Sequence, residues 1–265
     1  MPVYAKDQPE WFEQAVESII GQTLVSDDIV IVVDGPLTDE LERTLNKFNS
    51  DNVSIVRIEK NQGLSNALNV GINKAKYDLI ARMDSDDIAV LDRFELQVAE
   101  FSKNPELGIL GGQIAEFTDS PNEIVSYRKV PITHTQIKEF ARRRSPFNHP
   151  TVMYKKSVIQ NLHGYDTTAI RIEDYDLWLR AIHSGVVCGN VEAVLLKYRS
   201  TTDAMKRRKT LKSFKSHIRA RARFYSRNYI SFSDFSYGVV TQTILFILPS
   251  SVADAIFIRA VRVEK

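Results

Sequence analysis

Strand-like and helix-like segments alternate through the first third of the sequence, and this alternation restricts the fold more than any other feature. Short runs rich in Val and Ile are followed by segments with apolar residues at helical spacing. The pattern predicts strands at 28–34, 53–58 and 78–83 and helices at 8–21, 39–49 and 63–76. Such alternation is typical of βαβ units. We therefore expect an α/β, Rossmann-like fold with a mostly parallel sheet flanked by helices.

The sequence opens near the end of the first expected strand. Residues 1–4 (MPVY) are typical of the point where a strand leads into a loop, yet almost no strand precedes them. A sheet of this class normally begins with a full central strand. We therefore expect a truncated first strand, whose missing apolar residues belong on the amino-terminal side of Met1.

Composition and cysteine content narrow the class of protein. The chain has 265 residues, of which 43% are hydrophobic and 26% are charged, as in ordinary globular proteins. Its one cysteine, Cys188, excludes an internal disulfide framework and any cysteine-rich zinc or iron–sulfur site. Several acidic residues among the first twenty, such as Glu10 and Glu13, are atypical of a secretory signal. These features favour a cytoplasmic location.

Three carboxylates follow the third expected strand. Asp84, Asp86 and Asp87 repel one another, so the group is costly unless solvent or a cation compensates it. Ligands of parallel α/β sheets lie beyond the carboxyl ends of the strands, and a hard divalent cation prefers carboxylate oxygens. The alternative is a solvated acidic loop in which Asp87 or Asp92 caps a helix at 92–103.

Two further acidic positions lie at the ends of expected elements. Asp34 ends the strand at 28–34, and the alternative to a binding role is a turn-forming Asp before Gly35. Glu173 and Asp174 open a helix at 173–184. Acidic residues are favoured in the first turn of a helix by its dipole, so a purely structural role stays open there.

Basic residues are concentrated near the carboxyl end. Residues 1–203 carry 22 Lys and Arg against 30 Asp and Glu, whereas residues 204–233 carry 10 basic residues and no acidic one. We expect a long basic helix at 205–227 that faces an anionic membrane surface. A solvated helix docked on the domain is the alternative. Nucleic acid is not an expected partner, because no recognition module accompanies the charge. The apolar stripe of this helix is predicted to consist of Phe214, Ile218, Ala222 and Tyr225.

An uncharged segment follows the basic helix. Residues 235–253 contain no charged side chain and approach membrane-spanning length, but polar residues and Pro249 interrupt them. We expect two short apolar helices that touch the membrane interface or pack on the domain. The expected organisation is a catalytic domain at 1–203 and a basic and apolar helical extension at 204–265.

Seven motifs, taken in order and spacing, resemble the family 2 inverting glycosyltransferases of the GT-A fold. The resemblance covers about the first 200 residues and is strongest to the group that builds bacterial O-antigen, capsule and exopolysaccharide repeat units. The matching segments are 1–4 (MPVY), 18–23 (SIIGQT), 33–35 (VDG), 61–69 (NQGLSNALN), 81–87 (ARMDSDD), 149–153 (HPTVM) and 173–180 (EDYDLWLR).

The resemblance implies roles for residues of the nucleotide site. Pro2 and Val3 are expected to line the base pocket through backbone contacts, and Asp34 to accept a hydrogen bond from the uracil imide. Val33 departs from the family pattern, since it replaces the first acid of the usual Asp-Asp-Gly. The base-contacting acid of that motif is retained.

The resemblance also implies how the diphosphate is held. Asp84 and Asp86 correspond to the family's ribose and metal acids, with Asp86 as the direct ligand of Mg²⁺ or Mn²⁺. Leu68 departs from the family pattern, because many members have an Arg near the diphosphate there. Stabilisation of the leaving group is therefore expected from the metal together with Arg82 or Lys6.

On the acceptor side, the resemblance makes Asp174 the general base and Glu173 a supporting acid. His149 and Trp178 are candidates for contact with the acceptor sugar. For both, a purely structural role stays open, because a loop histidine and aromatics at helical spacing are often packed in the protein.

The resemblance predicts an inverting, metal-dependent hexosyltransferase. It is expected to move a sugar from a UDP-sugar to a lipid-linked or oligosaccharide acceptor at the inner face of the bacterial membrane. Two alternatives stay open on the residues: a non-catalytic polyanion- or membrane-binding protein, and a nucleotidyltransferase. The latter needs a phosphate loop rich in Gly and basic residues near the first strand, and residues 1–10 show none.

Overall fold

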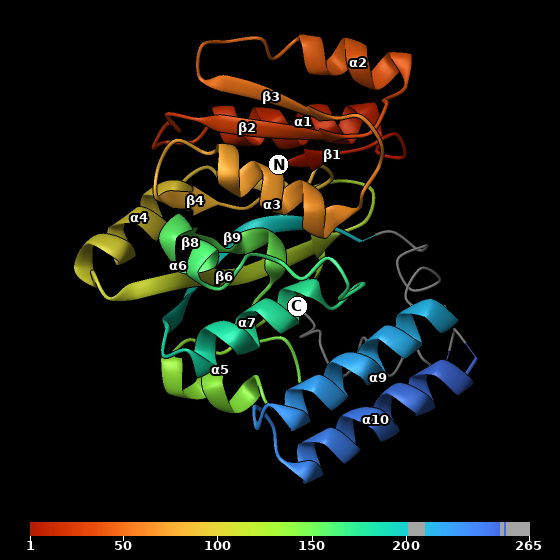
Figure 1. The fold of residues 1–265 in the computed structure, drawn as a ribbon. Helices are drawn as coiled ribbons and strands as arrows, with labels where there is room; N and C mark the ends of the chain where they lie inside the picture. Colours follow the sequence, from red (N-terminus) through yellow and green to blue (C-terminus); the bar gives the residue numbers. More distant parts are fainter. Residues whose placement is uncertain (201–209, 250–251, 253–265) are drawn as a thin grey trace.

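The computed structural model describes residues 1–200, 210–249 and 252, and it confirms the predicted α/β fold. Three parallel strands form one sheet in the order β1-β2-β3, with helices packed around it (Figure 1). The elements of this part are β1 (Pro2–Val3), α1 (Pro9–Ile20), β2 (Ile29–Asp34), α2 (Asp39–Asn46), β3 (Val53–Ile58) and α3 (Leu64–Lys74).

Local sequence explains the boundaries of these elements. Pro9 stands in the first turn of α1, where its missing N–H is not needed. The Thr38 side chain accepts a hydrogen bond from the Leu41 N–H at 3.3 Å, so it caps α2. β2 is buried along nearly its whole length, which agrees with its continuous run of β-branched residues.

A second, mixed sheet follows in the order β4-β8-β6-β9-β5, and β7 pairs with β6. Only β6 and β9 run parallel to each other; the other pairs are antiparallel. Its strands are β4 (Leu79–Ala81), β5 (Ile88–Ala89), β6 (Leu107–Phe117), β7 (Ile124–Arg128), β8 (Met153–Lys155) and β9 (Val187–Arg199). The helices around it are α4 (Arg93–Lys103), α5 (His134–Phe140), η1 (His149–Thr151), α6 (Lys156–Asn161) and α7 (Glu173–His183).

The carboxyl-terminal helices form a hairpin of α9 (Leu211–Ser226) and α10 (Phe232–Ile247) that docks beside α7 (Figure 1). Ala220 and Phe224 of α9 are buried in the same apolar cluster as the core of α7. Of the predicted apolar stripe of this helix, Phe214 and Ile218 are half-buried, and Ala222 and Tyr225 are exposed. The face that packs on the domain is the neighbouring one. The expected boundary between residues 203 and 204 lies outside the described residues, as does most of the second apolar helix predicted near the end of the chain.

Asp234 attaches this hairpin to the loop after α5. Its carboxylate is almost fully buried and pairs with Arg142 at 2.7 Å and Arg143 at 3.0 Å. Burial alone raises the pKa of Asp234, but hydrogen bonds from Ser231, Arg143 and Arg142 outweigh it and lower the pKa to about 2. The carboxylate is therefore charged at neutral pH and holds α10 in place.

A buried polar network lies beneath the loop that follows β4. The Gln97 side chain donates to the carbonyls of Leu110 at 3.1 Å and Thr151 at 2.9 Å, and it accepts from Arg93 Nε at 3.1 Å. Arg93 in turn donates to the carbonyl of Arg82 at 2.8 Å. Gln97 and Arg93 are both fully buried, so water does not compete for these hydrogen bonds. The network therefore fixes the backbone at Arg82.

We expect Gln97→Leu to destabilise the protein by about 2–4 kcal/mol, because two buried carbonyls and Arg93 Nε lose the hydrogen bonds that Gln97 makes with them. Urea denaturation measures the change. Gln160→Leu, on the exposed surface of α6, is the matched control and should stay within about 0.5 kcal/mol of the parent. Equal midpoints for the two variants would contradict the role of the network.

Candidate active site

The three carboxylates after β4 lie together. Their closest oxygens are all within 4.8 Å of one another, with Asp84 and Asp86 partly exposed and Asp87 buried. Arg82 forms an ion pair with Asp84 at 2.5 Å, and its guanidinium is itself almost fully buried. The cluster is thus a pocket of negative charge that is only partly balanced by the protein.

Burial raises the pKa of Asp86 to about 7, and the charges of Asp84 and Asp7 add to the effect. Burial also raises the pKa of Asp87 well above its usual range, again with a contribution from its acidic neighbours. The charged form of a carboxyl group in such surroundings is destabilised, and a cation that binds beside it stabilises that form.

Arg199, at the end of β9, holds the acidic loop and was not anticipated from the sequence. Its backbone N–H donates to Asp87 Oδ1 at 2.9 Å, and its guanidinium donates to the Asp86 carbonyl at 3.0 Å. Asp92 stands at the N-cap position of α4, but its side chain makes no capping hydrogen bond. Asp87 is fully buried and accepts the Arg199 N–H, which argues against the alternative of a solvated acidic loop.

Asp34, at the end of β2, is buried, and both of its carboxylate oxygens accept backbone N–H groups. Gln62 donates to Oδ1 at 2.7 Å and Gly63 donates to Oδ2 at 2.9 Å. The carboxylate thus ties the end of β2 to the loop before α3. Each oxygen has a second lone pair and keeps capacity for one more donor. Pro2 and Val3 of β1 lie beside Val32 and Val33 of β2.

Glu173 and Asp174 occupy the first turn of α7 and are partly buried. The Ser145 hydroxyl donates to Asp174 Oδ2 at 3.3 Å. Burial raises the pKa of Asp174, and burial together with the charge of Asp174 raises the pKa of Glu173 to about 7. A carboxylate whose affinity for a proton is increased in this way is suited to accept one from a bound hydroxyl group.

Arg82 connects the two acid groups electrostatically. Its positive charge opposes the effect of burial on the pKa of Asp86 and also on that of Asp174. Contacts also link the two segments: the Arg82 N–H donates to the Val152 carbonyl at 2.9 Å, directly after η1, and the His149 ring of η1 packs against Trp178 of α7.

His149 lies between aromatic side chains. Its Nε2 is 3.0 Å from the Tyr165 hydroxyl, and burial lowers the pKa of His149 well below its usual value, so the ring is neutral. Trp178 is fully buried and packs against His149 with ring centroids 6.0 Å apart. Its indole therefore supports the histidine from the core and offers no free surface to a sugar.

Asn69 of α3 holds the chain at Tyr165. Its side-chain oxygen accepts the Tyr165 N–H at 2.8 Å, and its amide donates to the Tyr165 carbonyl at 2.9 Å. The same tyrosine meets His149 through its hydroxyl. Hydrogen bonds thus connect α3, which follows the loop that Asp34 holds, to Tyr165 and His149 beside α7.

The acidic cluster has the donors that a divalent cation requires. Mg²⁺ and Mn²⁺ prefer oxygen ligands, and the cluster supplies three carboxylates at bridging distance. Asp87 Oδ2 is buried and has no hydrogen-bond partner among the described residues, which is costly unless it faces a cation. The residues present therefore fit a divalent metal ion.

Comparison with known proteins identifies the family. A family model described as glycosyl transferase family 2 matches residues 1–162. A UDP-Gal:alpha-D-GlcNAc-diphosphoundecaprenol beta-1,3-galactosyltransferase of Escherichia coli is 36% identical over 263 residues, which cover 99% of this chain and 95% of that protein. The amylovoran biosynthesis glycosyltransferase AmsE of Erwinia amylovora is 36% identical over 217 residues, which cover 82% of this chain and 80% of that protein.

A solved structure supports the fold. The mannosyltransferase PcManGT from Pyrobaculum calidifontis, in complex with GDP-Man and Mn²⁺, superposes with a TM-score of 0.63 at 14% identity. The match covers 98% of this chain and 74% of that one, and it identifies the GT-A architecture. The chain belongs to glycosyltransferase family 2, and its relatives include enzymes that build bacterial surface polysaccharides.

Proposed function

We propose that this glycosyltransferase moves a hexose from a UDP-sugar to a lipid-linked acceptor, with inversion at the anomeric carbon. The observation that carries the proposal is the acidic cluster, whose three carboxylates fit a divalent cation, together with Asp174, which Ser145 contacts in the first turn of α7. The name of the Escherichia coli relative supports galactose as the first donor sugar to test and a diphosphoundecaprenol-linked sugar as the acceptor.

The nucleotide is held by the first sheet in this proposal. Pro2 and Val3 contact the base through their backbone, and Asp34 accepts the uracil imide with the lone pairs that Gln62 and Gly63 leave free. Leu68 supports no phosphate contact, because it is buried on α3. In this proposal, cations nearer the acidic cluster contact the phosphates instead.

Departure of the diphosphate is assisted at the acidic cluster. Asp86 and Asp84 would hold Mg²⁺ or Mn²⁺, with Asp87 as a third oxygen donor, and the ion would supply positive charge to offset that of the departing diphosphate. Arg82 orients Asp84 through its ion pair. Lys6 is exposed in the loop after β1 and provides a mobile cation for the outer phosphate.

Asp174 removes the proton of the attacking hydroxyl. A sugar hydroxyl loses its proton far above neutral pH, so a base at hydrogen-bond distance is needed as the bond forms. Ser145 orients the carboxylate of Asp174. The pKa of the neighbouring Glu173 is raised, so Glu173 takes up a proton more readily and leaves Asp174 as the basic member of the pair. Attack opposite to the leaving diphosphate converts an α-linked donor into a β-linked product.

The acceptor is placed near His149 in this proposal. The neutral imidazole, held by Tyr165 and backed by Trp178, offers one nitrogen to an acceptor hydroxyl. Trp178 contributes through this support, since it is fully buried.

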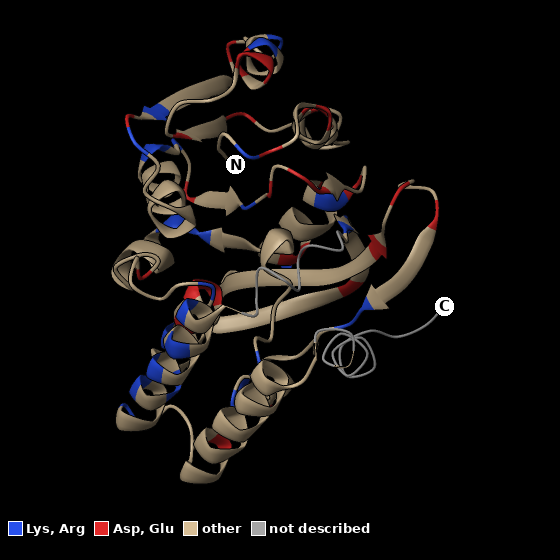
Figure 2. Ribbon diagram, turned by 90° about the vertical axis from the view of Figure 1, so that its right-hand side faces the viewer, with Lys and Arg blue, Asp and Glu red and all other residues tan. Residues whose placement is uncertain are grey.

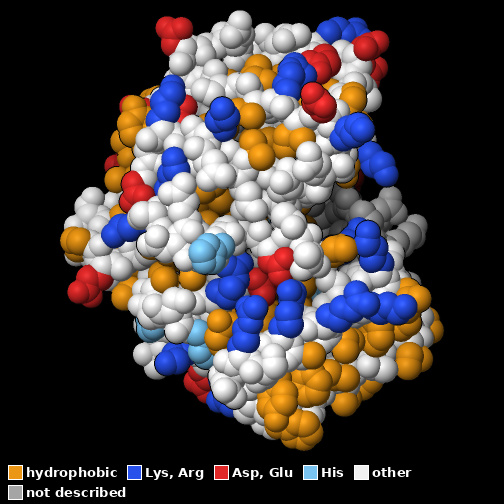
Figure 3. Space-filling model, viewed as in Figure 1, with side chains coloured by type: hydrophobic (Ala, Val, Ile, Leu, Met, Phe, Trp, Pro, Cys, Tyr) orange, Lys and Arg blue, Asp and Glu red, His pale blue; other side chains and the backbone are white. Residues whose placement is uncertain are grey.

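The α9–α10 hairpin supports docking on an anionic membrane surface. Lys and Arg line α9 (Figure 2), and apolar side chains gather over the hairpin on one face of the molecule (Figure 3). Phe232 is 64% exposed and Ile247 is 75% exposed. None of the helices in the described parts of the chain is long and apolar enough to cross a membrane. Surface docking at the inner face of the bacterial membrane presents the site to a lipid-linked acceptor.

We expect Asp174→Asn to lower the turnover of UDP-galactose by about 10²–10⁴-fold, because the amide cannot take up the proton. UDP binding, measured by calorimetry, should stay within about twofold, since the residue acts on the acceptor. Asp51→Asn, on an exposed loop, is the control and should leave both quantities unchanged. Retained turnover in Asp174→Asn would refute its role as the base.

Asp86→Asn should weaken Mn²⁺ binding by tenfold or more, as seen by electron paramagnetic resonance of free Mn²⁺, because a charged ligand is lost. Chelation of the metal by EDTA should stop transfer, and added Mg²⁺ or Mn²⁺ should restore it. Asp92→Asn, an acid at the start of α4 with no capping bond, is the matched control. Unchanged Mn²⁺ affinity in Asp86→Asn would remove it from the metal site.

Replacing Lys212, Lys215 and Arg219 by Glu should reduce flotation with phosphatidylglycerol vesicles about tenfold or more, because each basic residue contributes to binding at an anionic surface. These three side chains are exposed on α9. Replacement of the exposed Lys60, Lys74 and Lys103 by Glu makes the same change in net charge away from the hairpin. Equal losses in the two variants would argue against a specific docking face.

A further inference from the structure

Three consecutive arginines, at positions 142–144, lie between α5 and the first turn of α7. All three side chains are exposed. The next residue along the chain is Ser145, whose hydroxyl donates to Asp174 Oδ2 at 3.3 Å. A group of positive charges therefore adjoins the carboxylate that is proposed to act as the base.

The α9–α10 hairpin holds the backbone of this arginine segment. Arg221 of α9 is buried, and its guanidinium donates to the Arg142 carbonyl at 3.3 Å and to the Arg143 carbonyl. Gly238 of α10 makes room for this guanidinium, because a Cβ atom at position 238 would lie only 2.6 Å from it. The hairpin thus spends a buried charged side chain on fixing the position of the arginines.

The hairpin also contacts the arginine side chains. The Asp234 carboxylate pairs with both Arg142 and Arg143, so one negative charge is shared between two guanidinium groups. The Arg143 guanidinium lies over the ring of Tyr237, 4.8 Å from its centroid. The two arginines are therefore held in place while their combined charge stays positive.

Arg144, the last of the three, is suited to bind an anion. Its guanidinium lies over the Phe140 ring, 4.9 Å from the centroid. Burial lowers the pKa of Arg144, and the positive charge of Arg128 lowers it further, against an opposing contribution from Tyr237. An anion beside the guanidinium would stabilise its charged form, and the planar fork of arginine matches the oxygens of a phosphate.

An apolar stripe on α10 begins where the arginine segment touches that helix. Its four members recur at spacings of three and four residues, so they share one face of the helix. Their exposed fractions are 49% for Tyr237, 55% for Val240, 48% for Ile244 and 75% for Ile247. The stripe starts beside Arg143 and runs toward the carboxyl end of α10. It belongs to the apolar surface over the hairpin in Figure 3.

We propose that the arginine segment and the stripe on α10 bind the lipid-linked acceptor, with the arginines on its diphosphate and the stripe on the first part of its lipid chain. The inference rests on the proposed function, in which Asp174 takes a proton from the acceptor sugar. The order of groups along the surface matches the order within such a molecule. The sugar lies at Asp174, the diphosphate beside Arg144 and the lipid on α10.

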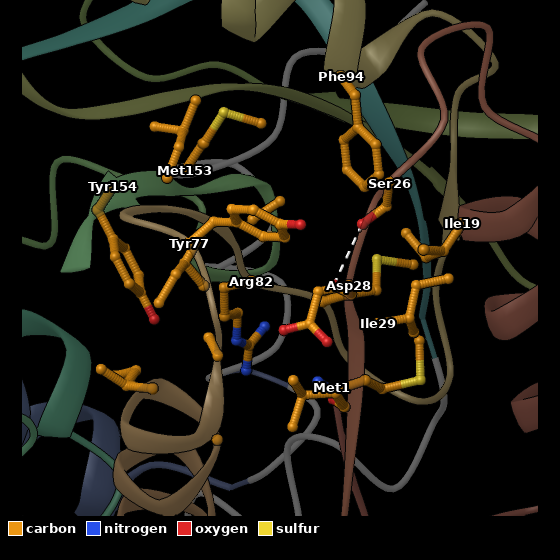
Figure 4. Close-up of a pocket in the computed structure, with 18 of the residues that line it drawn as sticks. Met1, Ile19, Ser26, Asp28, Ile29, Tyr77, Arg82, Phe94, Met153 and Tyr154 are labelled. Carbon is orange, nitrogen blue, oxygen red and sulfur yellow. Dashed lines mark hydrogen bonds between the residues drawn. The ribbon is translucent and has the colours of Figure 1, made fainter. Parts of the chain in front are cut away.

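The cavity between β2 and β4 is less suited to this diphosphate. It has a volume of about 390 Å³, and Arg82 and Asp28 both border it (Figure 4). The Arg82 guanidinium is already paired with Asp84, and Asp28 adds a carboxylate that repels an anion. The rest of the lining is mainly apolar. The arginine segment therefore offers the better site for a diphosphate.

Calorimetry with the decyl ester of α-GlcNAc diphosphate tests the role of the arginines. UDP and Mn²⁺ are present in excess, so that the ester does not compete for the proposed nucleotide site. Arg144→Gln should bind the ester at least about tenfold more weakly than the parent, and Arg144→Lys should lose less, because it keeps the charge without the fork. Lys138→Gln, which removes an exposed cation of α5, is the matched control and should bind as the parent does.

Comparison of the decyl ester with the propyl ester tests the stripe. The parent should bind the decyl ester at least about tenfold more tightly, because the longer chain buries more apolar surface. Val240→Ser combined with Ile244→Ser should lose most of this preference. Leu91→Ser combined with Val125→Ser removes two exposed apolar side chains elsewhere and should keep it. An equal preference in both double variants would remove the stripe from the site.

Galactose transfer to the decyl ester separates this inference from the proposed function. Binding that depends on Arg144, without any transfer by the parent, would support the site and refute the proposed reaction. Transfer in which Arg144→Gln keeps the parent's KM for the ester would overturn the inference and leave the reaction intact. A parent that does not bind the ester would also overturn the inference.

Flotation separates the acceptor from the membrane surface as the source of the phosphates. Arg144→Gln should float with phosphatidylglycerol vesicles within about twofold of the parent, because most of the surface charge lies on α9. A loss of flotation as large as the loss of ester binding would show that Arg144 binds anionic lipid in general. That result would overturn the assignment to the acceptor diphosphate.

Discussion

Unbalanced negative charge at the end of β4 is the constraint on which the active site depends. Carboxylates within 4.8 Å of one another repel, and only part of this repulsion is offset by the protein. Arg82 pairs with Asp84, Arg199 holds the backbone and carboxylate of the neighbouring acids, and Gln97 keeps the buried network beneath them closed. The uncompensated remainder is the reason we propose a divalent cation at this loop, and such a cation would offset the charge of a diphosphate.

Features that depend on a few neighbouring residues could be predicted from the sequence. The alternation of strands and helices, the Thr38 cap and the acidic group around Asp86 are all local patterns, and the structure contains them. The association of Asp174 with that group was expected only from the family resemblance, because the two are distant in the chain. Contacts from Arg82 to Val152 and from His149 to Trp178 of α7 connect the two segments.

Features that depend on tertiary packing could not be predicted. Arg199 is a single basic residue at the end of a strand, and nothing around it in the sequence signals its contact with Asp87. Periodicity alone could not distinguish the buried Ala220 from the exposed Ala222 on α9, since both lie near apolar neighbours. For Trp178, residue type left both a sugar contact and a core position open, and its burial identifies it as a core residue.

The tether between Asn69 and Tyr165 has a consequence for protein engineering. Because one side chain on α3 satisfies both backbone groups of a residue almost a hundred positions away, the loop that carries the tyrosine is not an independent module. A loop graft that aims to change which sugar is accepted must bring a compatible partner at position 69. Otherwise the transplanted loop loses two hydrogen bonds and the imidazole of His149 loses its support.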